Sequence, residues 1–200
     1  MAVRSVLSRL TPKTSALFLC DMQEKFRNTV SFFPQIVSVS KRMLDAARIL
    51  EIPVVVTEQY PKGLGKTVQD LGLTTDIKPF EKTCFSMVVD SVEKHLTQQK
   101  TSVQSIILCG IEAHACIFQT GMDLLERGYD VHLVVDASSS RNMVDRLFAF
   151  RQLEKAGVHL TTSECVILAL LRDANHPKFK EVQKLLMEIS PDSGLLQHKL

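Results

Sequence analysis

One cysteine stands where a thiol could act as a nucleophile. Cys116 follows a predicted strand and a short turn, and it lies at the start of a helix predicted over residues 115–127. A thiol at a helix N-terminus faces partial positive charge and unpaired backbone N–H groups, and both favour the nucleophilic thiolate. The same N–H groups could hold an oxyanion formed during acyl transfer. The alternative is a buried, inert cysteine, and the other cysteines fit it: Cys20, Cys84, Cys109 and Cys165.

Two charged residues are candidates to assist such a thiol. A cysteine nucleophile needs a group that takes or relays its proton. Asp21 directly follows the first predicted strand, although a turn acid or a helix cap would look the same. Lys82 lies in a predicted loop, where most lysines are solvated, and spacing alone does not select it.

Short apolar runs alternate with longer segments of helical periodicity along the chain. The predicted strands are residues 16–20, 53–57, 77–80, 105–109, 131–135 and 158–161. The predicted helices are residues 34–50, 88–99, 115–127, 144–156, 164–171 and 179–187. The alternation predicts an α/β fold with three layers: a doubly wound, mostly parallel sheet of about six strands, covered by helices on both faces.

In such sheets the ligand site lies beyond the carboxyl ends of the strands. The polar or turn residues expected to share that edge are Asp21, Glu58, Gln59, Gly110 and Asp136.

Four local features complete this expectation. Gly110 is expected to break the fourth strand, and residues 60–65 are expected to form a loop because they contain one proline and two glycines. The serines at 138–140 are interpreted as a loop with a helix cap, and Ser163 as the N-cap of the following helix.

Length and composition fit one domain, predicted at residues 14–190, with a short basic tail at 1–13 and a C-terminal tail at 191–200. The formal net charge of +2 gives no electrostatic case for nucleic acid or an anionic membrane. The longest apolar stretch, residues 165–171, is far too short to span a bilayer. We therefore expect neither nucleic acid nor a membrane as a partner.

The N-terminal residues leave two locations open. Arg4, Arg9 and Lys13 precede the first acidic residue, Asp21, and this composition is typical of a mitochondrial transit peptide. A short basic tail would have the same composition. Five cysteines without a C-x-x-C pair indicate reduced thiols in the cytosol or the mitochondrial matrix.

Three segments together resemble the isochorismatase-like cysteine hydrolases. Residues 16–26, which read ALFLCDMQEKF, resemble the family's apolar strand followed by Asp-x-Gln-x-x-Phe. Lys82, followed by Phe85 and Ser86, resembles the family's lysine segment, and residues 110–116 (GIEAHAC) resemble its nucleophile turn. The resemblance covers about residues 14–171, with the motifs in the family's order.

The resemblance implies a catalytic triad of Asp21, Lys82 and Cys116. The Lys82 ammonium would favour the thiolate by charge attraction, while the Asp21 carboxylate would hold that ammonium and move the thiol proton. It also implies a cis peptide between Ile111 and Glu112, an oxyanion hole made by the backbone N–H groups of Glu112 and Cys116, and a homo-oligomer, a dimer or larger.

The departures from the family's patterns are also informative. Metal-dependent nicotinamidases of the family carry Asp-x-His after the second strand, whereas residues 57–60 read TEQY here, so we expect neither a metal nor another cofactor. The family's true isochorismatases cleave a vinyl ether and some lack the cysteine, so Cys116 points away from that reaction.

Several further residues are candidates for substrate contact. The candidate pocket walls are Phe26, Gln59, Tyr60, His114 and Phe118. Core packing for the two phenylalanines and a hydrogen-bonded turn for His114 are the alternatives. Arg141 could meet an anionic substrate or a neighbouring subunit.

We therefore expect an enzyme, a cysteine hydrolase that cleaves an amide-like C–N bond of a small molecule through a thioester. Three alternatives stay open. One is an interaction or regulatory protein with little turnover on a hydrolase scaffold, and another is an isochorismate-type vinyl ether hydrolase. The third is a redox role for Cys116, although no second cysteine is placed in the sequence as an obvious resolving partner.

Overall fold

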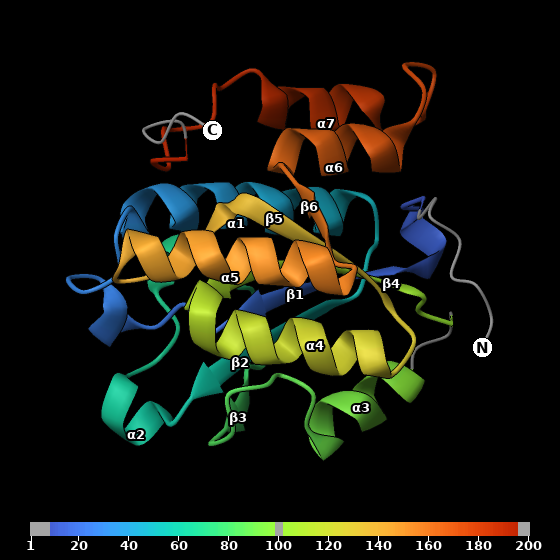
Figure 1. Ribbon diagram of the computed structural model, residues 1–200. Helices are drawn as coiled ribbons and strands as arrows, with labels where there is room; N and C mark the ends of the chain where they lie inside the picture. The colour runs from blue at the N-terminus through green and yellow to red at the C-terminus, as the bar shows by residue number, and fades with distance from the viewer. Residues whose placement is uncertain (1–8, 99–101, 196–200) are drawn as a thin grey trace.

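A six-stranded parallel sheet forms the middle layer of the molecule, in the order β3-β2-β1-β4-β5-β6. The computed structural model describes residues 9–98 and 102–195. Helices cover both faces of the sheet, with α1 and α6 on one side and α3, α4 and α5 on the other (Figure 1). The predicted three-layer, doubly wound α/β fold is therefore confirmed.

The strands are β1 (Ser15–Cys20), β2 (Val54–Gln59), β3 (Phe80–Lys82), β4 (Ser105–Ile111), β5 (Asp130–Ser139) and β6 (His159–Thr161). The helices are α1 (Phe33–Ile49), α2 (Pro61–Leu64), α3 (Asp90–Thr97), α4 (Phe118–Glu126), α5 (Met143–Ala156), α6 (Ser163–Leu171) and α7 (Phe179–Leu186). Three 3₁₀ turns span Pro12–Thr14, Glu24–Phe26 and Gln69–Leu71, and a π-helical turn spans Ala113–Ile117.

The two central strands, β1 and β4, are buried along their whole length. Their side chains alternate between two apolar cores, as in any sheet that is covered on both faces. Leu17, Leu19 and Cys109 face the core beneath α1 and α6, whereas Phe18 and Cys20 face the core beneath α3, α4 and α5. This alternation decides which cysteines can meet.

The strand order reverses between β1 and β4. From β1 the next strands in the chain, β2 and β3, lie toward one edge of the sheet, whereas from β4 the next strands, β5 and β6, lie toward the other edge. Open parallel sheets bind ligands in the crevice beyond the strand ends at such a reversal. Asp21 follows β1, and the turn that carries Cys116 follows β4. The topology thus brings the two residues to one crevice.

The structure corrects several local expectations. Gly110 does not break β4, because the strand continues through it to Ile111. The register between β4 and β5 shifts after Leu108, so that β5 extends through the serines 138 and 139, which were expected in a loop. The N-cap of α5 is instead Asn142, whose side chain accepts a hydrogen bond from the Val144 backbone N–H.

Three further corrections concern the strand ends. Residues 61–64 form the short helix α2 rather than a loop. Lys82 ends β3, which pairs in parallel with β2 and lies later in the chain than expected. Ser163 lies inside α6, where its backbone N–H and hydroxyl donate to the two carboxylate oxygens of Asp136. Asp136 therefore holds the start of α6.

Part of each expected tail falls outside the described residues, namely 1–8 and 196–200. Two arginines hold the described residues that follow α7. Arg146 is buried and donates to the backbone oxygen of Ser193, and Arg42 donates to the backbone oxygen of Glu188. These contacts fix the chain after α7 to the domain. No helix in the described part of the chain is long and apolar enough to span a bilayer.

Candidate active site

Asp21 lies at the centre of a buried polar cluster. It directly follows β1 and has a φ of 51°, a left-handed conformation that aspartate tolerates better than most residues. Its Oδ1 accepts a hydrogen bond of 2.8 Å from Thr57 Oγ1, and its Oδ2 accepts 2.7 Å from Lys82 Nζ. The Cys20 thiol also points at Oδ2, at 3.5 Å. The carboxylate is thus held on both oxygens.

Lys82 reaches Asp21 because β3 pairs with β2 so that Lys82 lies opposite Gln59. Its side chain is 0% exposed. Besides Asp21, the ammonium lies 2.7 Å from Gln59 Oε1, 2.8 Å from the Phe85 carbonyl oxygen and 3.2 Å from that of Cys84. These acceptors replace the water that a surface lysine would have.

The charge on Lys82 is stable in this setting. Burial lowers the pKa of a lysine, but attraction to the Asp21 carboxylate and to the charged forms of Cys20 and Cys116 outweighs burial, and the pKa of Lys82 is raised above its ordinary value. Lys82 therefore acts as a fixed cation near neutral pH rather than as a base.

The turn after β4 brings Cys116 to the same cluster. Gly110 has a φ of 126°, and a Cβ there would lie 2.2 Å from the Cys20 backbone oxygen, so only glycine lets the two strands approach this closely. Cys116 is 7% exposed and lies in the π-helical turn before α4. The sulfur atoms of Cys20 and Cys116 and a carboxylate oxygen of Asp21 all lie within 4.8 Å of one another. The three residues of the expected triad are thus brought together.

These two thiols and the carboxylate are also the described residues that could hold a metal ion. The Lys82 ammonium already occupies the cationic position beside the carboxylate, 2.7 Å from Oδ2. A metal cation there would meet charge repulsion at short range. The donor set therefore fits a fixed ammonium better than a metal.

A second ion pair holds the turn that carries the nucleophile. The peptide between Ile111 and Glu112 is cis. The Glu112 carboxylate accepts hydrogen bonds from the backbone N–H and the guanidinium of Arg141, the shortest being 2.6 Å. Burial would raise the pKa of Glu112, but these bonds and the charge of Arg141 lower it. Arg141 was considered for an anionic substrate, whereas its guanidinium is already paired within the chain.

The candidate pocket residues separate into different roles. Gln59 holds the Lys82 ammonium and donates from Nε2 to the Thr83 backbone oxygen, at 2.6 Å. His114 shares a hydrogen bond of 3.0 Å with Ser140. Phe26 and Phe118 pack against apolar clusters, each remaining partly exposed.

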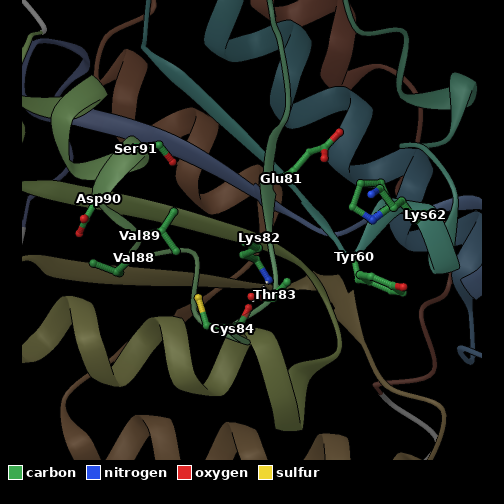
Figure 2. Close-up of a pocket in the computed structure, with 11 residues that line it drawn as sticks. Tyr60, Lys62, Glu81, Lys82, Thr83, Cys84, Val88, Val89, Asp90 and Ser91 are labelled. Carbon is green, nitrogen blue, oxygen red and sulfur yellow. Dashed lines mark hydrogen bonds between the residues drawn. The ribbon is translucent and has the colours of Figure 1, made fainter.

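Tyr60 lines a cavity of about 800 Å³ that reaches Lys82 along the outer side of β3. Figure 2 shows Lys82 pointing into this region between Tyr60 and Cys84. The lining residues are Tyr60, Pro61, Lys62, Glu81, Lys82, Thr83, Cys84, Val88, Val89, Asp90 and Ser91. The residues that line this cavity include neither Asp21 nor Cys116, and the Lys82 side chain itself is buried.

Sequence reasoning missed the location of Cys20 in the site and misjudged the exposure of two other cysteines. Cys20 was interpreted as an inert strand residue, yet its thiol faces Asp21 and lies near Cys116. Its position next to Asp21 in the sequence was the available signal. Cys84 and Cys165 are exposed rather than buried, because they lie in the loop after β3 and on the outer side of the first turn of α6.

Comparisons with known proteins point in one direction. The family description that matches residues 15–165 is "Isochorismatase domain". The chain is 59% identical over 190 residues to isochorismatase domain-containing protein 2 of Xenopus laevis, covering 95% of this chain and 92% of that protein.

Solved structures agree with this result. A structure titled MAR1 ribonuclease from Caenorhabditis elegans is 54% identical, covers 96% of this chain and 100% of its own, and superposes with a TM-score of 0.91. The YcaC gene product of Escherichia coli, described as an octameric hydrolase of unknown specificity, is 22% identical, covers 90% of this chain and 96% of its own, and superposes with a TM-score of 0.76. At that identity the likeness concerns the fold alone.

Proposed function

The chain belongs to the isochorismatase family and has its hydrolase scaffold, and we propose that it is a metal-independent cysteine hydrolase that cleaves amide-like C–N bonds of small molecules. The observation that carries the proposal is the buried Asp21–Lys82 ion pair, with a carboxylate oxygen of Asp21 within 4.8 Å of the Cys116 sulfur. A thiol, a proton acceptor and a fixed cation together are the groups that nucleophilic catalysis by cysteine requires.

The roles follow from the contacts. The Cys116 sulfur attacks the carbonyl carbon of the substrate while the thiol proton passes to the Asp21 carboxylate. Asp21 then gives this proton to the leaving nitrogen, the C–N bond breaks, and a thioester remains on Cys116. Water attacks the thioester, its proton passes to Asp21, the acid product leaves, and the proton returns to the sulfur. Lys82 stays protonated throughout, since all its neighbours are acceptors.

The negative charge that develops on the substrate oxygen needs donors. We assign this role to the backbone N–H groups of Glu112, which directly precedes the turn before α4, and of Cys116, which lies within it. Arg141 supports them indirectly, because it holds the Glu112 side chain through the bonds described above. Preorganised donors of this kind stabilise a tetrahedral intermediate by about 2.7–4 kcal/mol each.

The direct test is turnover of a panel of small primary amides and carbamoyl compounds, measured by release of ammonia. C116A should lose all measurable turnover and keep its circular dichroism spectrum. C84A is the matched control, because Cys84 lines the cavity and is exposed, and it should retain most of the wild-type rate. Turnover that survives in C116A would refute the mechanism.

The name of the Caenorhabditis elegans structure makes ribonuclease activity a second candidate. Against it, the cation that pairs with Asp21 is fully buried and bonded within the chain, the exposed Arg141 is already paired with Glu112, and the formal net charge is only +2. Binding of the phosphate backbone needs accessible lysine and arginine side chains. Degradation of RNA by wild-type protein and not by C116A would support this candidate. Equal degradation by both would indicate a contaminating nuclease.

Other features of the function remain proposals. We propose that the protein forms a homo-oligomer, as membership of its family implies, and light scattering would measure its mass. We place it in the cytosol or the mitochondrial matrix, because all five cysteines are free thiols. A protein partner that still binds C116A would favour the regulatory alternative, and isochorismate in the substrate panel would test the vinyl ether alternative.

A further inference from the structure

Two of the five thiols face each other inside the candidate site. Cys20 is fully buried at the end of β1, and its sulfur lies within 4.8 Å of the Cys116 sulfur. Both side chains belong to the core beneath α3, α4 and α5. Cys109 on the neighbouring strand faces the opposite core, so it has a different environment.

We propose that Cys20 and Cys116 form a reversible disulfide when the protein meets hydrogen peroxide or an organic hydroperoxide, and that this bond removes the nucleophile from catalysis. The inference rests on the proposed function only in that Cys116 must be a reactive thiol. Cys20 is then the resolving cysteine that the sequence did not reveal.

The chemistry balances with the peroxide as oxidant. The Cys116 thiolate attacks one peroxide oxygen, the O–O bond breaks, and the leaving hydroxide or alkoxide takes up a proton while Cys116 becomes a sulfenic acid. The Cys20 sulfur then attacks the Cys116 sulfur, the S–O bond breaks, and the hydroxyl leaves as water with the Cys20 proton. Two thiols lose two electrons in total and the peroxide gains them.

The surroundings of Cys20 suit the resolving role. Burial, a hydrogen bond with Cys116 and the charge of Asp21 raise the pKa of the Cys20 thiol well above its ordinary value. Cys20 therefore stays protonated at rest and does not compete with Cys116 for the oxidant. When it attacks the sulfenic acid, the Asp21 carboxylate, 3.5 Å away, can accept its proton.

Access and geometry set the order of events. Cys116 is 7% exposed and Cys20 is 0% exposed, so a small peroxide reaches Cys116 first. A disulfide needs a sulfur–sulfur distance of about 2.05 Å, so at least one of the two side chains must rotate. Because two thiols join only when two electrons are removed, the bond forms after the peroxide has made Cys116 electrophilic.

The experiment uses the full chain, reduced and then exposed to increasing hydrogen peroxide, with free thiols blocked by N-ethylmaleimide. Trypsin releases Cys20 in residues 14–25 and Cys116 in residues 101–127, which also contain Cys109. The C109A variant makes the assignment unambiguous, and because Cys109 is fully buried in the opposite core, circular dichroism checks that C109A keeps the wild-type fold. C109A/C20S is the matched variant without a resolving thiol.

In oxidised C109A, the peptides that contain Cys20 and Cys116 should be joined by a disulfide in the digest, and dithiothreitol should separate them. In C109A/C20S, the joined species should be absent and Cys116 should accumulate as sulfinic acid, which dithiothreitol does not reverse. Equal sulfinic acid formation in both variants, or joining of Cys116 to Cys84, would overturn the inference.

Iodoacetamide labelling of Cys116 and amide turnover, measured in parallel, separate this inference from the proposed function. Fast labelling and turnover without a disulfide contradict the inference alone. A disulfide without amide turnover contradicts the proposed function alone. A Cys116 that neither labels nor oxidises contradicts both.

Discussion

Replacing Lys82 with methionine should destabilise the fold and lower the reactivity of the Cys116 thiol. Met fills a similar volume but leaves the Asp21 carboxylate buried without the cation that now lies 2.7 Å from it. Removing one partner of a buried ion pair typically costs about 3–5 kcal/mol. Total stability of a natural domain is about 5–15 kcal/mol, so the loss is large and measurable.

The double variant D21N/K82M separates charge pairing from packing. An asparagine can still accept the hydrogen bond from Thr57 Oγ1, and no unpaired charge remains in the core. We expect D21N/K82M to be more stable than K82M by at least about 1 kcal/mol, because an unpaired buried charge costs more than a neutral pair.

Urea unfolding at neutral pH, followed by circular dichroism, gives both free energies. K178M is the matched control, because Lys178 is paired with Glu181 and both side chains are exposed, at 42% and 54%. Exposed pairs contribute about 0–1 kcal/mol, so K178M should cost no more than that. A K82M variant as stable as K178M, or a double variant less stable than K82M, would refute the assignment of Lys82 as the buried counter-charge.

Three further predictions follow from other contacts. Burial and the neighbouring His159 lower the pKa of His132 to about 4, below its unfolded value of about 6.5. Between these pH values the unfolded chain therefore binds more protons than the folded chain. Up to about 3 kcal/mol of the free energy of unfolding is lost as the pH falls from 6.5 to 4. H132F should flatten that part of the stability curve in urea unfolding at several pH values, and an unchanged slope would exclude His132 as its source. G110A should cost more stability than G128A and slow Cys116 labelling, since both have positive φ but only a Cβ at Gly110 meets backbone, 2.2 Å away; equal unfolding midpoints would argue against the close strand approach. R141M should lower kcat with little effect on Lys82 pairing, and an unaltered kcat would remove Arg141 from the positioning of the turn.

The sequence predicts the crevice well because the relevant information is local. Apolar runs that end at Asp21 and at the turn before Cys116 predict two buried parallel strands, and parallel strands place their carboxyl ends together. What sequence could not supply was the neighbour relation of β1 and β4, which follows from the order of the whole sheet. The resemblance to a family, rather than spacing, selected Lys82.

The misjudged features depend on contacts between distant segments. Arg141 looked like a free cation because Glu112 precedes it by 29 positions in the chain, and only the long β5 brings the two together. Cys20 looked inert because burial of a cysteine in a strand is ordinary. Its nearness to Cys116 arises from the tight approach at Gly110, and no periodicity in the sequence reports that approach.

The central claim is that Cys116 is an activated nucleophile, and competitive labelling of the folded protein tests it most directly. Iodoacetamide at a limiting concentration and neutral pH should modify Cys116 before Cys84 and Cys165, although Cys116 is buried and the other two are exposed. Mass spectrometry of the peptides measures the rate at each thiol. Labelling that instead follows exposure, with Cys84 and Cys165 first and Cys116 protected, would contradict the account.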